Sequence, residues 1–373
     1  AANTEFVDWC TDISKAFLQG LSFKELHELT GEKMRNVSFT LPQWASKVLC
    51  QLEGFEDYDP AVECLECLKP GTGCVDAPRA FSLKLSRTLQ ACDMRPTLAD
   101  DQLEVCHDKG RLNLAMTKHV DDLRFTGEEA KATQVVNKLK EEFGDLDIEK
   151  DEYTNCGVEH KRLSNGTVEM TQNRYINSLK TIGHPKLVGA AAEAETSAEV
   201  HQLFQSLLGA AAFTLLTQHW IAVYIISLQR HTHASKNIHV RRLNAVVRAL
   251  QKSPAKLVFH AMNCSNKIVS FMDAAFAKEQ DKGYGLRGAV RLRKGMGTDT
   301  GIEVYHMLLA ECKSLKLVTR SSFSSETLGL TGGLDSMWPL MVTLHEVAHG
   351  PLHADEARKI REEGGLKVRA DAF

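Results

Sequence analysis

The alternation of apolar and polar side chains predicts a β-hairpin within the first 150 residues. In a half-buried strand the apolar side chains recur with a period of two, and four apolar residues fit this period: Leu112, Leu114, Met116 and Val120. The chain then reaches Asp121 and Asp122, after which Leu123 and Phe125 begin a returning strand. Two adjacent aspartates are therefore expected at the tip of a hairpin whose base is held in a core.

Similar patterns predict the elements around this hairpin in residues 1–150. A strand over 6–13 ends at Asp12, and a helix is expected to begin near Ser14. A second helix follows Thr126, whose spacing to Glu129 is that of a capping box, and ends at Gly144. This first region therefore mixes short strands with helices.

The remainder of the chain divides into two further regions. Residues 151–260 begin with a hairpin around Asn165 and Gly166, a favoured turn pair, and become helical over 200–229. Residues 261–373 are expected to hold three strands, at 267–273, 284–293 and 302–310. Two helices then follow, one from about Ser325 and one at 354–363, and a last strand begins at Lys367. The whole is an α+β chain of two or three domains.

Composition narrows the class of protein. Hydrophobic residues make up 43% of the 373, but no run approaches the length of a membrane span, so we expect no membrane partner. Ten cysteines without a regular framework indicate reduced thiols inside the cell, in cytoplasm or nucleus. The start lacks the features of a signal peptide and lies in an expected strand, which indicates a fragment.

One segment is strongly basic although the formal net charge is only −3. Residues 230–267 carry eight Lys and Arg, four His and no Asp or Glu. A solvated helix face usually mixes both signs, whereas basic residues without acidic neighbours can follow phosphates. The segment is a candidate nucleic-acid contact.

Adjacent carboxylates at a turn repel one another unless they are solvated or share a cation. Asp100 and Asp101 are interpreted as an ordinary surface turn. Asp121 and Asp122 become a functional candidate if Asp12 joins them from another strand. Such a cluster can hold two divalent ions for phosphoryl transfer, and Mg²⁺ suits its hard oxygen ligands, with Mn²⁺ as the alternative.

Four motifs then resemble the reverse transcriptases of copia-type retrotransposons, in the family's order. They are residues 11–20 (TDISKAFLQG), 54–57 (GFED), 77–81 (APRAF) after Gly73, and 119–122 (HVDD). The resemblance implies that Asp12 and Asp121 hold metal, with Asp122 in support. It also implies that Phe17 screens the sugar of the incoming nucleotide, and that Gly73, Pro78 and Arg79 grip the template.

The last region resembles the RNase H domain of the same family. Residues 270–275 (SFMDAA) and 320–326 (RSSFSSE) match its first catalytic strand and helix, and residues 368–371 (VRAD) match a later strand. The resemblance implies a second two-metal cluster of Asp273, Glu326 and Asp371, with metal on Asp273 and Glu326. Its substrate would be the RNA strand of an RNA–DNA hybrid.

Several residues depart from the family's pattern. Only 11 residues precede Asp12, so the fingers that clamp the nucleotide are expected to be missing. Val75 and Asp76 replace Lys and Gln of the grip motif, and His119 replaces Tyr. We therefore expect a polymerase fold with little or no polymerase activity.

Two other motifs suggest zinc. Residues 344–349 contain His345, Glu346 and His349 in the HExxH spacing of zinc proteases, but the third ligand of the extended pattern is absent. The alternative is that both histidines simply finish the long helix. Cys64 and Cys67 form a CxxC without a second pair, so free thiols are favoured there.

These observations predict a reverse transcriptase palm over 1–150, a thumb and connection over 151–260, and an RNase H-like domain over 261–373. The expected partners are an RNA template, a DNA primer, an RNA–DNA hybrid and deoxynucleoside triphosphates. The sequence does not indicate an oligomeric state. A non-catalytic transposon remnant that binds nucleic acid through 230–267 is the alternative, and a zinc protease is a more distant one.

Overall fold

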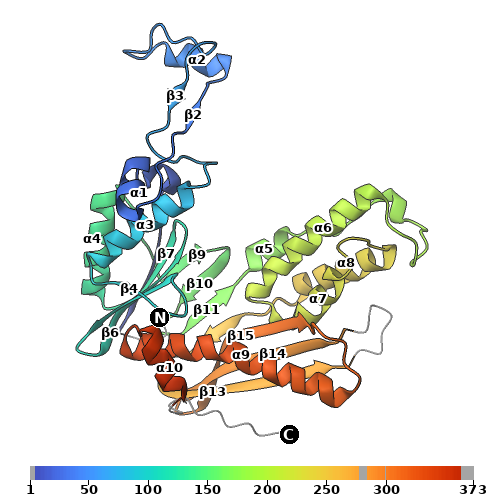
Figure 1. The fold of residues 1–373 in the computed structure, drawn as a ribbon. Helices are drawn as coiled ribbons and strands as arrows, with labels where there is room; N and C mark the ends of the chain where they lie inside the picture. Colours follow the sequence, from blue (N-terminus) through green and yellow to red (C-terminus); the bar gives the residue numbers. More distant parts are fainter. Residues whose placement is uncertain (1–4, 277–283, 299, 363–373) are drawn as a thin grey trace.

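The computed structural model describes residues 5–276, 284–298 and 300–362, and their fold is α+β (Figure 1). Three sheets of three or more strands and ten α-helices lie within these residues. No helix in this described part combines the length and hydrophobicity that a bilayer crossing requires.

The first region is built on a six-stranded sheet in the order β4-β5-β6-β7-β1-β8. Its strands are β1 (Val7–Asp12), β4 (Arg95–Pro96), β5 (Leu103–Asp108), β6 (Arg111–His119), β7 (Asp122–Gly127) and β8 (Glu149–Lys150). The helices α3 (Ala77–Gln90) and α4 (Glu129–Phe143) pack on it through an apolar core that includes Phe81, Leu114, Phe125 and Leu139.

Smaller elements extend from this sheet. They are η1 (Ala16–Gln19), α1 (Phe23–Thr30), β2 (Ser38–Phe39), α2 (Gln43–Leu49) and β3 (Leu65–Glu66). The pair β2–β3 and helix α2 project away from the remaining chain (Figure 1). Several large apolar side chains are exposed on this projection, among them Trp44, Val62 and Leu68.

The second region joins a small sheet to a helical bundle. The sheet has the order β12-β11-β10-β9, with β9 (Glu152–Asn155), β10 (Val158–Arg162), β11 (Val168–Thr171) and β12 (Leu257–Phe259). The helices are α5 (Asn173–Ser178), η2 (Pro185–Leu187), α6 (Ala198–Phe213), η3 (Thr214–Leu216), η4 (His219–Ile221), α7 (Ala222–Gln229) and α8 (Asn237–Lys252). Their shared core includes Phe204, Ile225 and Leu243.

The third region is a three-stranded antiparallel sheet crossed by a long helix. The strands β13 (Met262–Ala275), β14 (Leu286–Gly297) and β15 (Glu303–Ser314) are followed by α9 (Ser322–His349) and α10 (Ala354–Glu362). Figure 1 shows α9 lying along this sheet and reaching toward the first region. Arg291 on β14 is fully buried beneath α9, where it pairs with Glu311 at 2.9 Å and donates to the carbonyl of Gly333.

The end of α9 is fixed to the first region by polar contacts. Glu346 is fully buried, and its Oε1 accepts hydrogen bonds from the amides of Leu98 at 2.8 Å and Leu352 at 3.0 Å. His107 on β5 lies 3.0 Å from the carbonyl of Val347. The contacts of Leu98 and His107 join segments more than 200 residues apart in the chain.

Two local expectations are wrong. No α-helix begins at Ser14, because Lys15 adopts a left-handed conformation (φ 54°) and only the 3₁₀ turn η1 follows. Thr126 does not cap α4, since its backbone belongs to β7 and pairs with both Ala115 and Asp8. The helix α4 begins later than that cap implies, at Glu129, and ends before Gly144 as expected. The strand predicted from Lys367 lies outside the described residues.

Candidate active site at the hairpin of the first sheet

The hairpin of β6 and β7 places two aspartates beside a third that precedes them by about 110 residues in the sequence. His119 pairs with Asp122 across a two-residue turn, and Asp12 pairs with Asp122 from the other side of β7. The amide of Ile13 donates to the carbonyl of Asp121 at 3.1 Å. Strand register thus brings Asp12, Asp121 and Asp122 to one end of the sheet.

The turn itself is strained. Val120 has φ 58°, a left-handed conformation that disfavours a β-branched residue. It occupies the first central position of the turn, where glycine is usual when φ is positive. Strain of this kind persists only where surrounding structure imposes it, and it concentrates at functional sites.

The three aspartates influence one another electrostatically. Partial burial raises the pKa of Asp12, and the nearby charges of Asp121 and Asp122 raise it further. None of the three forms an ion pair with a residue that the structure describes. The three carboxylates therefore repel one another without a neutralising ion pair from the described residues. Their hard oxygen ligands suit a divalent ion such as Mg²⁺.

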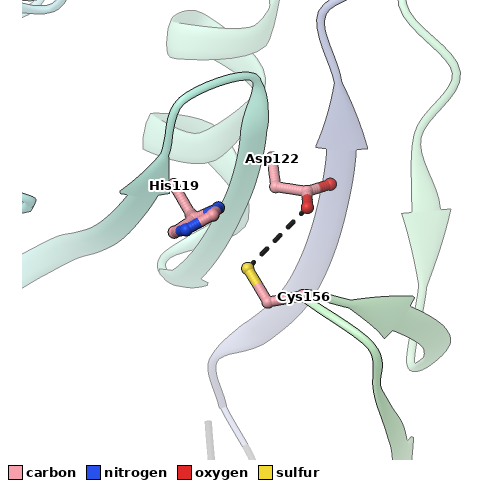
Figure 2. Close-up of side chains that lie close together, drawn as sticks. All are labelled: His119, Asp122 and Cys156. Atoms are coloured by element: carbon pink, nitrogen blue, oxygen red, sulfur yellow. Dashed lines mark hydrogen bonds between the residues drawn. The ribbon is translucent and has the colours of Figure 1, made fainter. Parts of the chain in front are cut away.

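A second group of side chains overlaps this cluster. His119, Asp122 and Cys156 place one potential ligand atom each within 4.8 Å of one another (Figure 2). Within the described residues, no other set of three His, Cys, Asp or Glu side chains meets this condition. The carboxylates of Asp12, Asp121 and Asp122 are therefore spaced more widely than this set.

Cys156 was missed by the sequence reasoning. It lies with Gly157 in the two-residue turn between β9 and β10, where Asn155 pairs with Val158. Both turn residues have positive φ, 48° and 73°, as the type I′ hairpin turn requires. A Cys-Gly pair between two short strands was the available signal, but nothing local connects that turn with the aspartates.

The hairpin of β9 and β10 is anchored to the first sheet by a buried network. Arg124 on β7 donates two hydrogen bonds to the carboxylate of Asp8, at 3.1 and 3.2 Å. The hydroxyl of Tyr153 donates to the same carboxylate at 2.7 Å, and its ring stacks on His160. Although burial opposes ionisation of Asp8, Arg124 and Tyr153 outweigh it and lower its pKa.

Burial and the nearby aspartates raise the pKa of the Cys156 thiol. It donates to Oδ2 of Asp122 at 3.7 Å. Burial, followed by the charge and hydrogen bond of Asp122 and the charge of Asp121, raises the thiol pKa to about 11. Without a bound cation, the sulfur therefore carries a proton at neutral pH.

The nucleotide and template candidates lie on the neighbouring helical segments. Phe17 is in η1 and packs against the core of the first region. Pro78 and Arg79 are in the first turn of α3, and Arg79 pairs with Glu32 at 2.6 Å. Gly73 has φ 94°, which favours glycine. Their roles toward a nucleotide or template stay predictions.

The RNase H-like carboxylates are arranged less favourably. Met272 and Ala274 face α9, since the backbone of Gly333 and Gly329 approaches them closely, so Asp273 between them projects from the opposite face of β13. Glu326 is exposed on α9 itself. Their joining around metal stays a prediction, and Asp371 lies outside the described residues.

The HExxH segment has a structural explanation. The carboxylate of Glu346 is buried against the amides of Leu98 and Leu352, so it is not free to serve as a general base beside His345 and His349. The rings of the two histidines lie 4.6 Å apart, at the end of α9. The thiol of Cys64 is exposed and that of Cys67 is half-buried, and neither joins a three-ligand group in the described residues.

The basic segment is partly neutralised and partly open. Lys236 pairs with Glu193 and Lys256 with Glu169, both outside the segment. In contrast, α8 exposes four basic side chains, Arg241, Arg242, Arg248 and Lys252. Part of the charge therefore remains available for phosphates.

Comparison with known proteins shows which proteins the chain is similar to. No protein-family model matches the chain. Two Arabidopsis thaliana proteins are similar to the chain in sequence. They are the retrovirus-related Pol polyproteins from transposons RE1 and RE2, and the chain is 22% identical to each over 329 residues. The chain is similar to retrotransposon Pol polyproteins. This confirms the resemblance to copia-type Pol that the motifs indicated.

The similarity covers 84% of this Pol-like chain but only 20% of each relative. The chain therefore spans about one fifth of the length of the curated relatives it matches. At this level of identity and coverage, the similarity relates the Pol-like chain to these polyproteins without assigning it their activities.

Proposed function

We propose that the Pol-like chain derives from the part of a copia-type polymerase that carries out RNA-directed DNA synthesis and degrades the RNA of the hybrid. The first region would be the palm, the second the thumb and connection, and the third the RNase H-like domain. Its substrates would be an RNA template, a DNA primer and deoxynucleoside triphosphates.

The meeting of Asp12 with Asp121 and Asp122 carries this proposal. The motifs that contain them lie about 110 residues apart, and nothing in the local sequence requires them to adjoin. Their strands pair in register at the end of one sheet, and the turn between them is strained at Val120. A chance resemblance in four short motifs gives no reason for that convergence.

The residues present would act by binding and orienting. Asp12 and Asp121 would hold Mg²⁺, which when bound stabilises the charge on the attacking and leaving oxygens of phosphoryl transfer. Asp122 would support the cluster from the opposite strand. Phe17, held against the core by η1, would limit the space at the sugar of the incoming nucleotide.

We expect the polymerase activity to be low. At the grip motif, Asp76 pairs with Arg35 at 2.5 Å and Arg79 with Glu32, so acidic groups occupy positions beside the proposed template path. A carboxylate near a phosphate path weakens its electrostatic attraction.

Primer extension on an RNA template tests the proposal directly. Extension that requires Mg²⁺ or Mn²⁺ is expected, and Asp121→Asn should abolish it. Asp101→Asn is the matched control, because it lies in the other Asp-Asp pair on an exposed turn. Equal extension by Asp121→Asn and the unmodified chain would refute the catalytic assignment.

A second candidate is a non-catalytic remnant that binds nucleic acid through α8. The exposed Arg241 and Arg248 lie seven residues apart, two turns along one side of the helix. Binding to an RNA–DNA hybrid should weaken with salt, and Arg241→Ala with Arg248→Ala should reduce the salt slope by about two. Hybrid binding with no extension by the unmodified chain would favour this candidate over the polymerase.

A further inference from the structure

We propose that His119, Asp122 and Cys156 form a binding site for a borderline-soft transition metal, with Zn²⁺ as the expected ion. The site adjoins the proposed magnesium cluster and is chemically distinct from it. Zinc binding can be measured without nucleotide or nucleic acid, so the inference does not depend on polymerase activity.

The ligand chemistry selects the metal. An imidazole nitrogen and a thiolate sulfur suit zinc, whereas magnesium prefers oxygen ligands alone. Three protein ligands leave a fourth tetrahedral position for water or another molecule, as in zinc sites that are open to solvent. The combination of His, Cys and Asp is therefore unsuited to Mg²⁺ and well suited to Zn²⁺.

The geometry requires little adjustment. Zinc bonds of about 2.0–2.3 Å in a tetrahedron place neighbouring ligand atoms roughly 3.3–3.8 Å apart. The sulfur of Cys156 already lies 3.7 Å from Oδ2 of Asp122. His119 completes the group within 4.8 Å, and its exposed ring can rotate to close the remaining gap.

The backbone holds the ligands on two separate hairpins that face each other (Figure 2). His119 and Asp122 are a cross-strand pair, and Cys156 is fixed by its type I′ turn. Phe213 lies behind that turn, so close to Gly157 that an added Cβ would approach its ring to 2.7 Å. The buried Asp8–Arg124–Tyr153 network prevents the second hairpin from moving away.

The site is accessible from solvent. His119, Asp122 and Cys156 line an open hollow of about 600 Å³ together with Ala212, Phe213, Leu215 and Leu216. Binding would replace the proton on the Cys156 sulfur with the metal and release that proton to water. The negative charge of Asp121 and Asp122 favours entry of a cation.

Cobalt substitution tests the proposal. One Co²⁺ per chain should produce the near-ultraviolet band of a thiolate-bound ion, and one equivalent of Zn²⁺ should displace it. At saturating Co²⁺, excess Mg²⁺ should leave the band in place, although it should raise the Co²⁺ concentration that half-fills the site, because both ions interact with Asp122. A band that Mg²⁺ removes, or no band at all, would overturn the proposal.

Variants identify the ligands. Cys156→Ser should abolish the band and weaken zinc binding by more than about 100-fold, since the loss of an outer-shell partner already costs 10–100-fold. His119→Gln should weaken zinc binding comparably. Because the side chain of His119 is exposed, this substitution is not expected to disturb folding, so the weaker binding would report the loss of a ligand. The double variant Cys64→Ser, Cys67→Ser should retain the band.

Two results would place the metal elsewhere and overturn the assignment. One is a band that survives Cys156→Ser but disappears in the Cys64→Ser, Cys67→Ser protein. The other is stoichiometric zinc that is lost on His345→Ala. Loss of primer extension in the Asp121→Asn protein with the cobalt band intact would support both sites separately.

Discussion

Tyr153→Phe is expected to loosen the hairpin that carries Cys156. The substitution removes one hydroxyl and leaves the ring that stacks on His160. That hydroxyl donates to the fully buried carboxylate of Asp8 at 2.7 Å and also lies 2.5 Å from Nε of Arg124. The hairpin of β9 and β10 would keep its backbone pairing but lose a polar link to β1 and β7.

The magnitude follows from the charge of the acceptor. A hydrogen bond to a charged group contributes about 1.5–3 kcal/mol, so local opening should become roughly 10- to 150-fold more frequent. Asp8→Asn should cost more, about 3–5 kcal/mol, because Arg124 then loses its charged partner in a mostly buried position. The two effects should be non-additive, since both residues belong to one network.

Hydrogen exchange of peptides covering residues 149–162 measures this local opening without assuming that the whole chain unfolds in one step. Tyr224→Phe is the control, because Tyr224 is exposed. The pKa of Asp8 is lowered on folding, so its contribution is complete above its unfolded value and disappears as pH falls through the lower folded value. Exchange equal to that of Tyr224→Phe would refute this reasoning.

Three further outcomes are expected. Arg291→Met should reduce the free energy of unfolding by about 3 kcal/mol and so lower the melting temperature. Burial opposes ionisation of its partner Glu311, but Lys313 and Arg291 help to hold the pKa of that carboxyl at about 2. The effect of the substitution should therefore shrink as pH falls from about 4.5 toward 2. Glu346→Ala should leave two amides unsatisfied and raise the proteolysis rate between the first and third regions, and no change would contradict its docking role. Gly157→Ala should abolish the cobalt band while secondary structure by circular dichroism is retained, and an intact band would show that the turn tolerates a side chain.

The elements that the sequence predicted correctly are those fixed by local pattern. The strand over 111–119 and the apolar face of the helix ending at Gly144 depend on residues that are neighbours in the chain, although Val120, which the alternation assigned to the strand, lies exposed in the turn. The hairpin at Gly166 likewise follows from a turn that needs positive φ. The error at Thr126 has the opposite origin, because two strands compete with the helix for its backbone and capping residues cannot reveal that competition.

The site was predictable only in part. Asp12 could be connected with Asp121 and Asp122 through the order of four motifs, but not through spacing or periodicity. Cys156 could not be connected with them at all, since its place depends on the Asp8–Arg124–Tyr153 network. Glu346 shows the reverse problem, in which a motif-like spacing marks a carboxylate that caps amides up to 248 residues away.

Asp122 belongs to both proposed sites, and that sharing has an electrostatic consequence. Its carboxylate faces Asp12 across one strand pair and His119 across the other, so a cation bound on either side reduces the negative potential on both. Two divalent ions at such short separation repel one another, and each must therefore weaken the binding of the other by the same factor. His119 stands where the copia-type motif has Tyr, and in the proposed zinc site it would add a nitrogen ligand that draws Asp122 toward a softer metal.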